Sequence, residues 1–153
     1  KAKKEIITIP LVQKILENEH ENGFDTLKPY NEFALRVTKT RDDLIEFIRT
    51  VRNEGKAIAA LGASTKGNVI LQYCGLTELD IQSIGEVNAE KYGCFAPGTW
   101  IPIVPEEDQL GGIFDYLIVL PWHFRTFFMN NPKLKSENLV FPLPKVEICK
   151  ASI

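Results

Sequence analysis

The sequence has few of the residues that stabilise small secreted domains or bind metal ions. Its 153 residues include three cysteines and two histidines, and no two cysteines form a Cys-x-x-Cys pair. Cys74, Cys94 and Cys149 are odd in number and far apart, so they predict neither a disulfide framework nor a structural zinc site. We therefore expect no metal site in this chain.

Charge and hydrophobicity exclude two further classes of partner. The net charge is -2 and charges of both signs are scattered, so no basic surface is predicted that would bind nucleic acid. No apolar run reaches the roughly 18 residues of a membrane span, and the opening KAKKEIITIP lacks the apolar core of a signal peptide. We expect a cytoplasmic chain that binds neither nucleic acid nor membranes. It starts at Lys1 rather than at Met, which indicates that a longer polypeptide was trimmed.

The pattern of residues changes near residue 55, and residues 1–55 predict a helical extension. Apolar residues recur at helical spacing in LVQKILENEHENG and in YNEFALRVTKTRDDLIEFIRTVRNEG, and each segment ends at a glycine. The second helix is expected to break near Thr40, where Thr40 or Asp42 would cap a new start. Its apolar stripe is expected to pack in a core, and consists of Phe33, Val37, Leu44, Ile45, Phe47, Ile48 and Val51.

Residues 56–153 alternate between predicted strands and predicted helices. The runs AIAALG and FDYLIVLPW are apolar without polar alternation, as expected of strands covered on both faces. Helices are expected in TKGNVILQYCGL and WHFRTFFMNN, and further strands in DIQSIGEVN, WIPIVP, NLVFPLP and KVEIC. Strands joined through helices indicate a mainly parallel sheet. The chain is therefore predicted to be an α/β protein, a Rossmann-like three-layer domain with a mainly parallel sheet, preceded by the helical extension.

The stretch AIAALGASTKGN joins a predicted buried strand to a helix through a glycine-rich loop. Ligands of such sheets bind at the carboxyl ends of the strands, and a helix start offers unpaired N–H groups to an anion. Ser64 or Thr65 can cap the helix or donate to a phosphate, and Lys66 adds a positive charge. Neither GxGxxG nor GxxxxGKS is present. We favour an anion site over a purely structural turn, and the loop does not single out NAD.

Glu86 follows Gly62 by about two dozen residues, at the end of the second predicted strand. A carboxylate at this place typically accepts hydrogen bonds from ribose hydroxyls in dinucleotide-binding folds. The alternative is a solvated acid at a strand end, followed by the turn residue Asn88. The residues alone leave both interpretations open.

Four ordered segments together resemble a known family. GASTKGNVILQYCGL, EVNAEKYGCFAPGTWIPI, DYLIVLPWHF and VFPLP are similar to the C-terminal domain of S-adenosylmethionine (SAM)-dependent C-methyltransferases that act on nucleotide-linked deoxysugars. YNEFALRV resembles the segment that precedes this domain in the family. The resemblance extends over nearly the whole chain.

The resemblance implies an incomplete enzyme. Members of the family are similar in having an N-terminal zinc domain, a central SAM-binding domain and a Rossmann-like C-terminal domain that helps to hold the sugar nucleotide. We expect the methyl donor and the catalytic base to belong to the missing upstream part, so that no catalytic residue and no cofactor is expected in this chain. The isolated chain should be inactive.

The family's glycine-rich loop matches Gly62, Ala63, Ser64, Lys66, Gly67 and Asn68, which the resemblance makes candidates for phosphate or nucleotide contact. Thr65, within the same loop, is a candidate from its place at the helix start. Glu86 and Asn88 would contact a ribose or a base edge. Pro97, Gly98 and Thr99 belong to a loop that should fold over the same cleft, and Trp122 matches an aromatic position of the family. His123 stands where the family often has Asn; it is placed for acid-base work, but we favour a histidine bonded to backbone.

Two functions remain open. The first is a substrate-holding module of a C-methyltransferase, with a nucleotide-linked sugar and the SAM-binding domain of the same or a partner chain as its partners. The second is a stand-alone Rossmann-like domain that binds NAD or CoA, or that is a scaffold without catalysis. Homo-oligomers are possible in either case. The PGTWIPI loop and the helical extension favour the first, because the second leaves them without a role.

Overall fold

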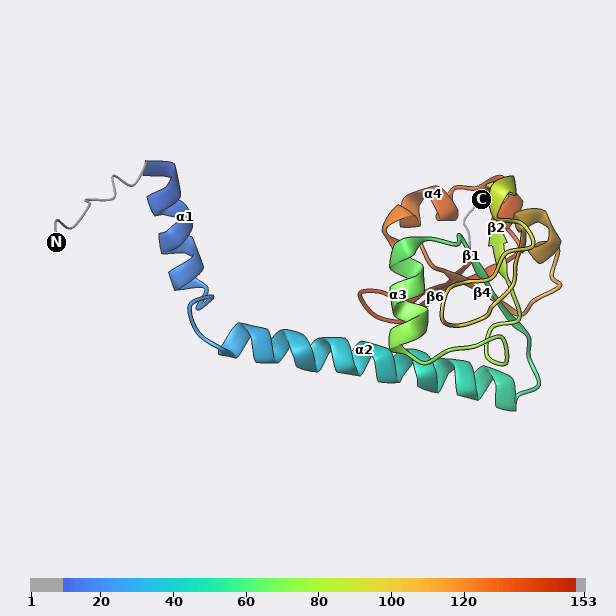
Figure 1. Ribbon diagram of the computed structural model, residues 1–153, viewed down its shortest axis with the longest axis horizontal. Coiled ribbons are helices and arrows are strands. Elements are labelled where there is room, and N and C mark those ends of the chain that lie inside the picture. Colours follow the sequence, from blue (N-terminus) through green and yellow to red (C-terminus); the bar gives the residue numbers. More distant parts are fainter. Residues whose placement is uncertain (1–9, 151–153) are drawn as a thin grey trace. The chain divides into compact units, whose positions relative to one another are not determined.

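The computed structural model describes residues 10–150, so residues 1–9 of the predicted extension and residues 151–153 lie outside it. Residue contacts divide the chain into two units, Lys1–Thr38 and Lys39–Ile153. The first unit contains helix α1, Pro10–Glu21, and the start of helix α2, Lys28–Asn53. The second contains the remainder of α2 and the sheet. Figure 1 labels α1, α2 and several strands of the sheet, and its colours follow the chain.

Helix α2 is continuous, so the predicted break near Thr40 is wrong. The Thr40 hydroxyl does not start a new helix; it donates to the carbonyl oxygen of Pro144 at 3.4 Å. The expected packing of the apolar stripe is only half right. Leu44 and its neighbours one and two turns later are buried, whereas Phe33 is 60% exposed. Helical spacing identifies an apolar face but cannot say whether another element covers it.

Six strands form one sheet in the order β3-β2-β1-β4-β5-β6. All neighbouring strands are parallel except β5 and β6, which are antiparallel, so the predicted mainly parallel α/β sheet is confirmed. The strands are β1 Ile58–Leu61, β2 Ile84–Glu86, β3 Ile103–Pro105, β4 Tyr116–Val119, β5 Asn138–Phe141 and β6 Glu147–Lys150. The remaining helices are α3 Thr65–Tyr73, α4 Arg125–Met129 and the short 3-10 turns η1 Ala89–Lys91, η2 Glu106–Gln109, η3 Trp122–Phe124 and η4 Pro132–Leu134.

Alternate residues of β1 point into two separate cores, one on each face of the sheet. Ile58 and Ala60 join a cluster with residues of α2 and α3. Ala59 and Leu61 join a second cluster, which includes Phe128 of α4. Helices therefore cover both faces of the sheet, and β1 is buried at every position because neither of its faces meets water.

The crossovers change face between β1 and β4. Helix α3 follows β1 and packs on one face, whereas α4 follows β4 and packs on the other. Because β1 and β4 are neighbours, the loops that leave their carboxyl ends separate at this point. Such a switch point is where open α/β sheets bind their ligands.

Strand β3 forms one edge of the sheet and has a proline at its end, Pro105, and another, Pro102, just before its start. The preceding loop folds back along it. Ile103 donates to Cys94 at 2.9 Å and accepts from Gly93 at 3.0 Å, while Phe95 forms an isolated bridge with Pro102. The loop that carries the predicted Pro97–Thr99 segment is thereby fixed against the sheet.

Among the helices described, none is long and apolar enough to cross a membrane. Within residues 10–150, no three His, Cys, Asp or Glu side chains gather in a way that could hold a metal ion.

Candidate functional site

The loop after β1 begins at a glycine whose backbone conformation other residues adopt rarely. Gly62 has a φ of 78°, and a Cβ atom at this position would lie 2.7 Å from the ring of Pro121. Pro121 belongs to the loop after β4. The two loops of the switch point are therefore in contact, and only a residue without a side chain fits between them.

Ser64 is the N-cap of α3. Its Oγ accepts a hydrogen bond from the backbone N–H of Gly67 at 3.1 Å, and its backbone is extended. This satisfies one of the N–H groups that a helix start leaves unpaired. The other N–H groups in the first turn of α3 have no partner within the helix, and they carry the partial positive charge of the helix start.

Gly67 has a packing role. It is buried, and a Cβ atom there would lie 2.5 Å from Cβ of Leu120. The absence of a side chain lets α3 approach the end of β4 closely. Gly62 and Gly67 were both predicted as ligand contacts. Close packing explains the need for glycine at each of these positions.

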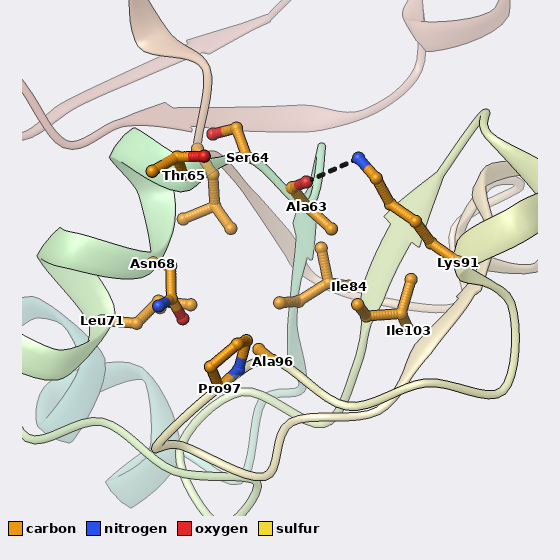
Figure 2. Close-up of a pocket in the computed structure, with 11 residues that line it drawn as sticks. Ala63, Ser64, Thr65, Asn68, Leu71, Ile84, Lys91, Ala96, Pro97 and Ile103 are labelled. Atoms are coloured by element: carbon orange, nitrogen blue, oxygen red, sulfur yellow. Dashed lines mark hydrogen bonds between the residues drawn. The ribbon is translucent and has the colours of Figure 1, made fainter.

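A cavity of about 310 Å³ opens between this loop, α3 and the segment before β3. We name it the loop cavity. Figure 2 shows Asn68 and Leu71 entering it from α3, Ile84 and Ile103 from the strands, and the ammonium group of Lys91 beside Ala63 at its edge. Its lining consists of Ala63, Ser64, Thr65, Asn68, Leu71, Ile84, Lys91, Ala96, Pro97, Ile103 and Leu120.

Asn68 lines this cavity and carries an unpaired polar atom. Its side-chain oxygen is buried, and no residue that the structure describes donates a hydrogen bond to it. Buried oxygens are nearly always paired in folded proteins, and leaving one unpaired costs roughly 1–3 kcal/mol. The rest of the inner wall is apolar, so Asn68 is the polar group most in need of a partner from a ligand.

Glu86 is 7% exposed and its carboxylate is held by three hydrogen bonds. One oxygen accepts from the backbone N–H groups of Val87 at 2.8 Å and Asn88 at 3.1 Å, and the other accepts from Lys91 at 2.9 Å. Burial by itself raises the pKa of Glu86, but the hydrogen bonds from Lys91, Asn88 and Val87 outweigh it. The pKa of Glu86 is lowered, and the group is an anion at neutral pH.

Lys91 connects Glu86 to the glycine-rich loop. Besides its bond to Glu86, its ammonium group donates to the carbonyl oxygen of Ala63 at 2.9 Å. An ammonium group has three N–H donors, so one remains available at the cavity edge. Sequence reasoning missed this residue; its spacing of five residues after Glu86, across a short turn capped by Asn88, was the available signal.

The positive charge that sequence reasoning did select, Lys66, is exposed and does not line the loop cavity. Thr65, by contrast, lines it. A cation on the exposed side of α3 interacts with a bound anion mainly through solvent, where the interaction is screened. Lys91 is the cation placed at the cavity.

The predicted loop of residues 97–99 has mixed roles. Pro97 lines the cavity, and its carbonyl oxygen accepts from Gln72 of α3 at 2.9 Å. Gly98 has a φ of 75° and lies against Gln72. Thr99 is 2% exposed and donates to the carbonyl oxygen of Ala96 at 3.3 Å, so it holds the turn rather than facing a ligand.

Two further predicted residues, Trp122 and His123, do not line the loop cavity. Trp122 is half-buried against the second core cluster. His123 is exposed, with its ring between the rings of Trp122 and Phe124 at centroid distances of 5.7 and 4.2 Å. Within residues 10–150, no hydrogen bond joins His123 to a carboxylate that would make it a general base. Asn88 is exposed and accepts from the N–H of Glu90 at 3.1 Å, which caps η1.

A second, smaller cavity of about 210 Å³ lies beyond Glu86 and contains further acids. Burial raises the pKa of Glu106 there; Lys133 opposes this effect and the charge of Glu86 adds to it. Glu107 lines the same cavity. Such a concentration of carboxylates disfavours phosphate, so the loop cavity is the better place for an anionic ligand.

Comparison with known proteins agrees with the resemblance seen in the sequence. A family model described as the C-methyltransferase C-terminal domain matches residues 1–144. The chain is also 32% identical over 145 residues to a protein named C-methyltransferase NovU from Streptomyces niveus. This alignment covers 93% of the chain and 34% of that relative, so the chain spans about a third of the relative's length. The predicted family is confirmed: the chain belongs to the C-methyltransferase C-terminal domain family.

Proposed function

We propose that this domain holds the nucleotide-linked sugar substrate of a C-methyltransferase, and that the loop of residues 62–68 contacts its phosphate groups. The observation that carries the proposal is the loop cavity at the start of α3, with Ser64, Thr65 and Lys91 in its wall. Helix-start N–H groups and an ammonium group favour an anion at this edge. The apolar interior is suited to an uncharged part of the same ligand.

The methyl donor of the parent enzyme is SAM, as the methyltransferase family implies. SAM carries a sulfonium cation, and the loop cavity does not fit it. The ammonium of Lys91 is at the cavity edge, and the nearest carboxylate, Glu86, is already paired with it. We therefore assign SAM and the transfer chemistry to the SAM-binding domain of the same or a partner chain. As a separate part of the proposal, we place the protein in the cytoplasm.

The state of Glu86 also favours the substrate-holding function over NAD binding. In dinucleotide-binding domains an acid at this place accepts from ribose hydroxyls. Here the carboxylate already accepts from two backbone N–H groups and from Lys91. Its main effect is to hold Lys91 beside the loop, which fits a phosphate site better than a ribose site.

The test is a parallel titration of the 153-residue chain with a thymidine-diphosphate sugar, NAD and SAM. The readout is the NMR chemical shift of the backbone amides from Gly62 to Asn68. We expect shifts with the sugar nucleotide alone. Saturation by NAD at lower concentration would contradict the proposal and support a dinucleotide-binding domain. Unchanged amide signals with all three would show that this loop binds no phosphate in the chain.

A further inference from the structure

We propose that the loop cavity binds the heteroaromatic base of a nucleoside diphosphate, and that Asn68 recognises an N–H group of this base. The inference deepens the proposed function and rests on it. It assigns separate parts of one ligand to separate parts of the site: the phosphates to the start of α3 and Lys91, and the base to the interior beside Asn68.

The chemistry of the walls selects the kind of group that enters. Leu71, Ile84, Ala96, Ile103 and Leu120 supply an apolar lining. A charged group, or a sugar with several hydroxyls, would lose hydrogen bonds to water there without replacing them. A nucleobase exposes two apolar faces and confines its polar atoms to its edge. Its faces can contact the aliphatic side chains while its edge meets the one polar group of the interior.

The size of the cavity agrees with a part of the ligand rather than with all of it. Its volume of about 310 Å³ is at the lower end of the range of about 300–1,000 Å³ found for small-molecule sites. The opening at the loop leaves the charged part of the ligand outside the apolar interior. There it meets Ser64, Thr65 and the third N–H of Lys91.

Asn68 supplies the specific contact. Rotation of the Asn68 side chain into the cavity would let its oxygen, which is now buried and unpaired, accept a hydrogen bond from a base N–H, and would let its amide NH2 donate to a neighbouring carbonyl of the same edge. Rotation of the amide by half a turn would bury the NH2 group instead, and this group would equally need a partner. Thymine and uracil carry an imide N–H between two carbonyl groups, which matches an asparagine amide in either orientation.

The test uses the 153-residue chain and three probes: thymidine diphosphate, thymidine diphosphate methylated at N3, and inorganic pyrophosphate. We expect calorimetry to show that Asn68→Leu weakens the binding of thymidine diphosphate by about tenfold, which corresponds to the loss of one hydrogen bond. Pyrophosphate affinity should not change, because pyrophosphate has no base. Methylation at N3 should weaken binding to the natural chain but have little further effect on Asn68→Leu.

Two further variants keep the result interpretable. Asn68→Ala repeats the test with a smaller side chain if Asn68→Leu changes the circular dichroism spectrum. Asn130→Leu is the matched control, because Asn130 is exposed and does not line the cavity, so it should bind every probe as the natural chain does. If thymidine diphosphate binds no more tightly than pyrophosphate, or if both Asn68 variants bind it normally, the inference is overturned while the phosphate site stands. If neither probe binds the natural chain, the proposed function fails as well.

Discussion

Lys91 and Glu86 form an ion pair of 2.9 Å, and the same ammonium group reaches the carbonyl oxygen of Ala63 at 2.9 Å. The carboxylate is nearly buried, whereas the lysine side chain is 42% exposed and touches the loop cavity. The pair therefore joins the end of β2 to the glycine-rich loop and fixes the position of a cation there.

Protonation of Glu86 should destabilise the fold. Because the pKa of Glu86 is lowered in the folded chain, its contribution to the free energy of unfolding is complete above the unfolded-state pKa and is lost as the pH falls through the folded-state pKa. Near neutral pH, Glu86→Gln should lower the free energy of unfolding by about 1–3 kcal/mol. Urea denaturation of both proteins between neutral pH and about pH 3 should show this difference shrinking with acidity. A difference that is constant over this range would contradict the ion-pair explanation.

The two lysines near the loop should differ in their effect on anion binding. Lys91→Ala removes a donor at the cavity edge and should weaken the binding of pyrophosphate by about tenfold, as expected for a hydrogen bond to a charged group. Lys66→Ala removes an exposed charge and should weaken it by about two- to threefold. Calorimetric titration measures both, with circular dichroism to check the fold. The opposite order would show that the anion lies on the exposed side of α3.

Loss of the N-cap of α3 should lower stability. Ser64→Ala removes the oxygen that accepts from Gly67, and should cost about 1 kcal/mol in the free energy of unfolding. Thr65→Ala is the control, because Thr65 is the exposed first residue of α3 and makes no capping bond. Chemical denaturation should separate the two variants. Equal losses would mean that the capping bond contributes little.

The cysteines should differ in reactivity. Burial raises the pKa of Cys74 to about 11, although the nearby charge of Arg41 opposes this effect. At pH 8 only about one Cys74 thiol in a thousand is then a thiolate, the reactive form. Cys94 is exposed. Iodoacetamide followed by mass spectrometry should therefore show Cys94 modified well before Cys74. Modification of Cys74 at the same rate would contradict the burial of its thiol.

Much of the fold could be predicted because it depends on local patterns. The uninterrupted apolar runs that became β1 and β4 indicated strands covered on both faces, and Gly23, Gly55 and Gly75, all with positive φ, follow the ends of helices. The continuity of α2 could not be predicted in the same way. Thr40 is a possible cap, and only its contact with Pro144 in the folded domain shows that it is used otherwise.

The candidate site was predictable in place but not in detail. The rule for parallel sheets led to the loop after β1, and Ser64 was recognised as a possible cap. The role of Lys91 depends on a turn after β2 that brings it back to Ala63, a contact between residues 28 positions apart. The loop cavity beside Asn68 is completed by Ile84 of β2, Ile103 of β3 and Pro97 of the loop before β3. Contacts between distant segments of this kind leave no periodic signal in the sequence.

The arrangement at β3 has a consequence for self-association. An outer strand recruits a strand from another molecule by offering free N–H and C=O groups. Pro102 and Pro105 have no N–H to offer, and both backbone groups of Ile103 are taken by Cys94 and Gly93. The outer edge of β3 is therefore closed to intermolecular strand addition, because the segment before β3 already occupies it. Fibrils cannot grow from this strand for the same reason. A dimer that joined the sheets of two copies edge to edge would then use β6, the other outer strand of the sheet in residues 10–150.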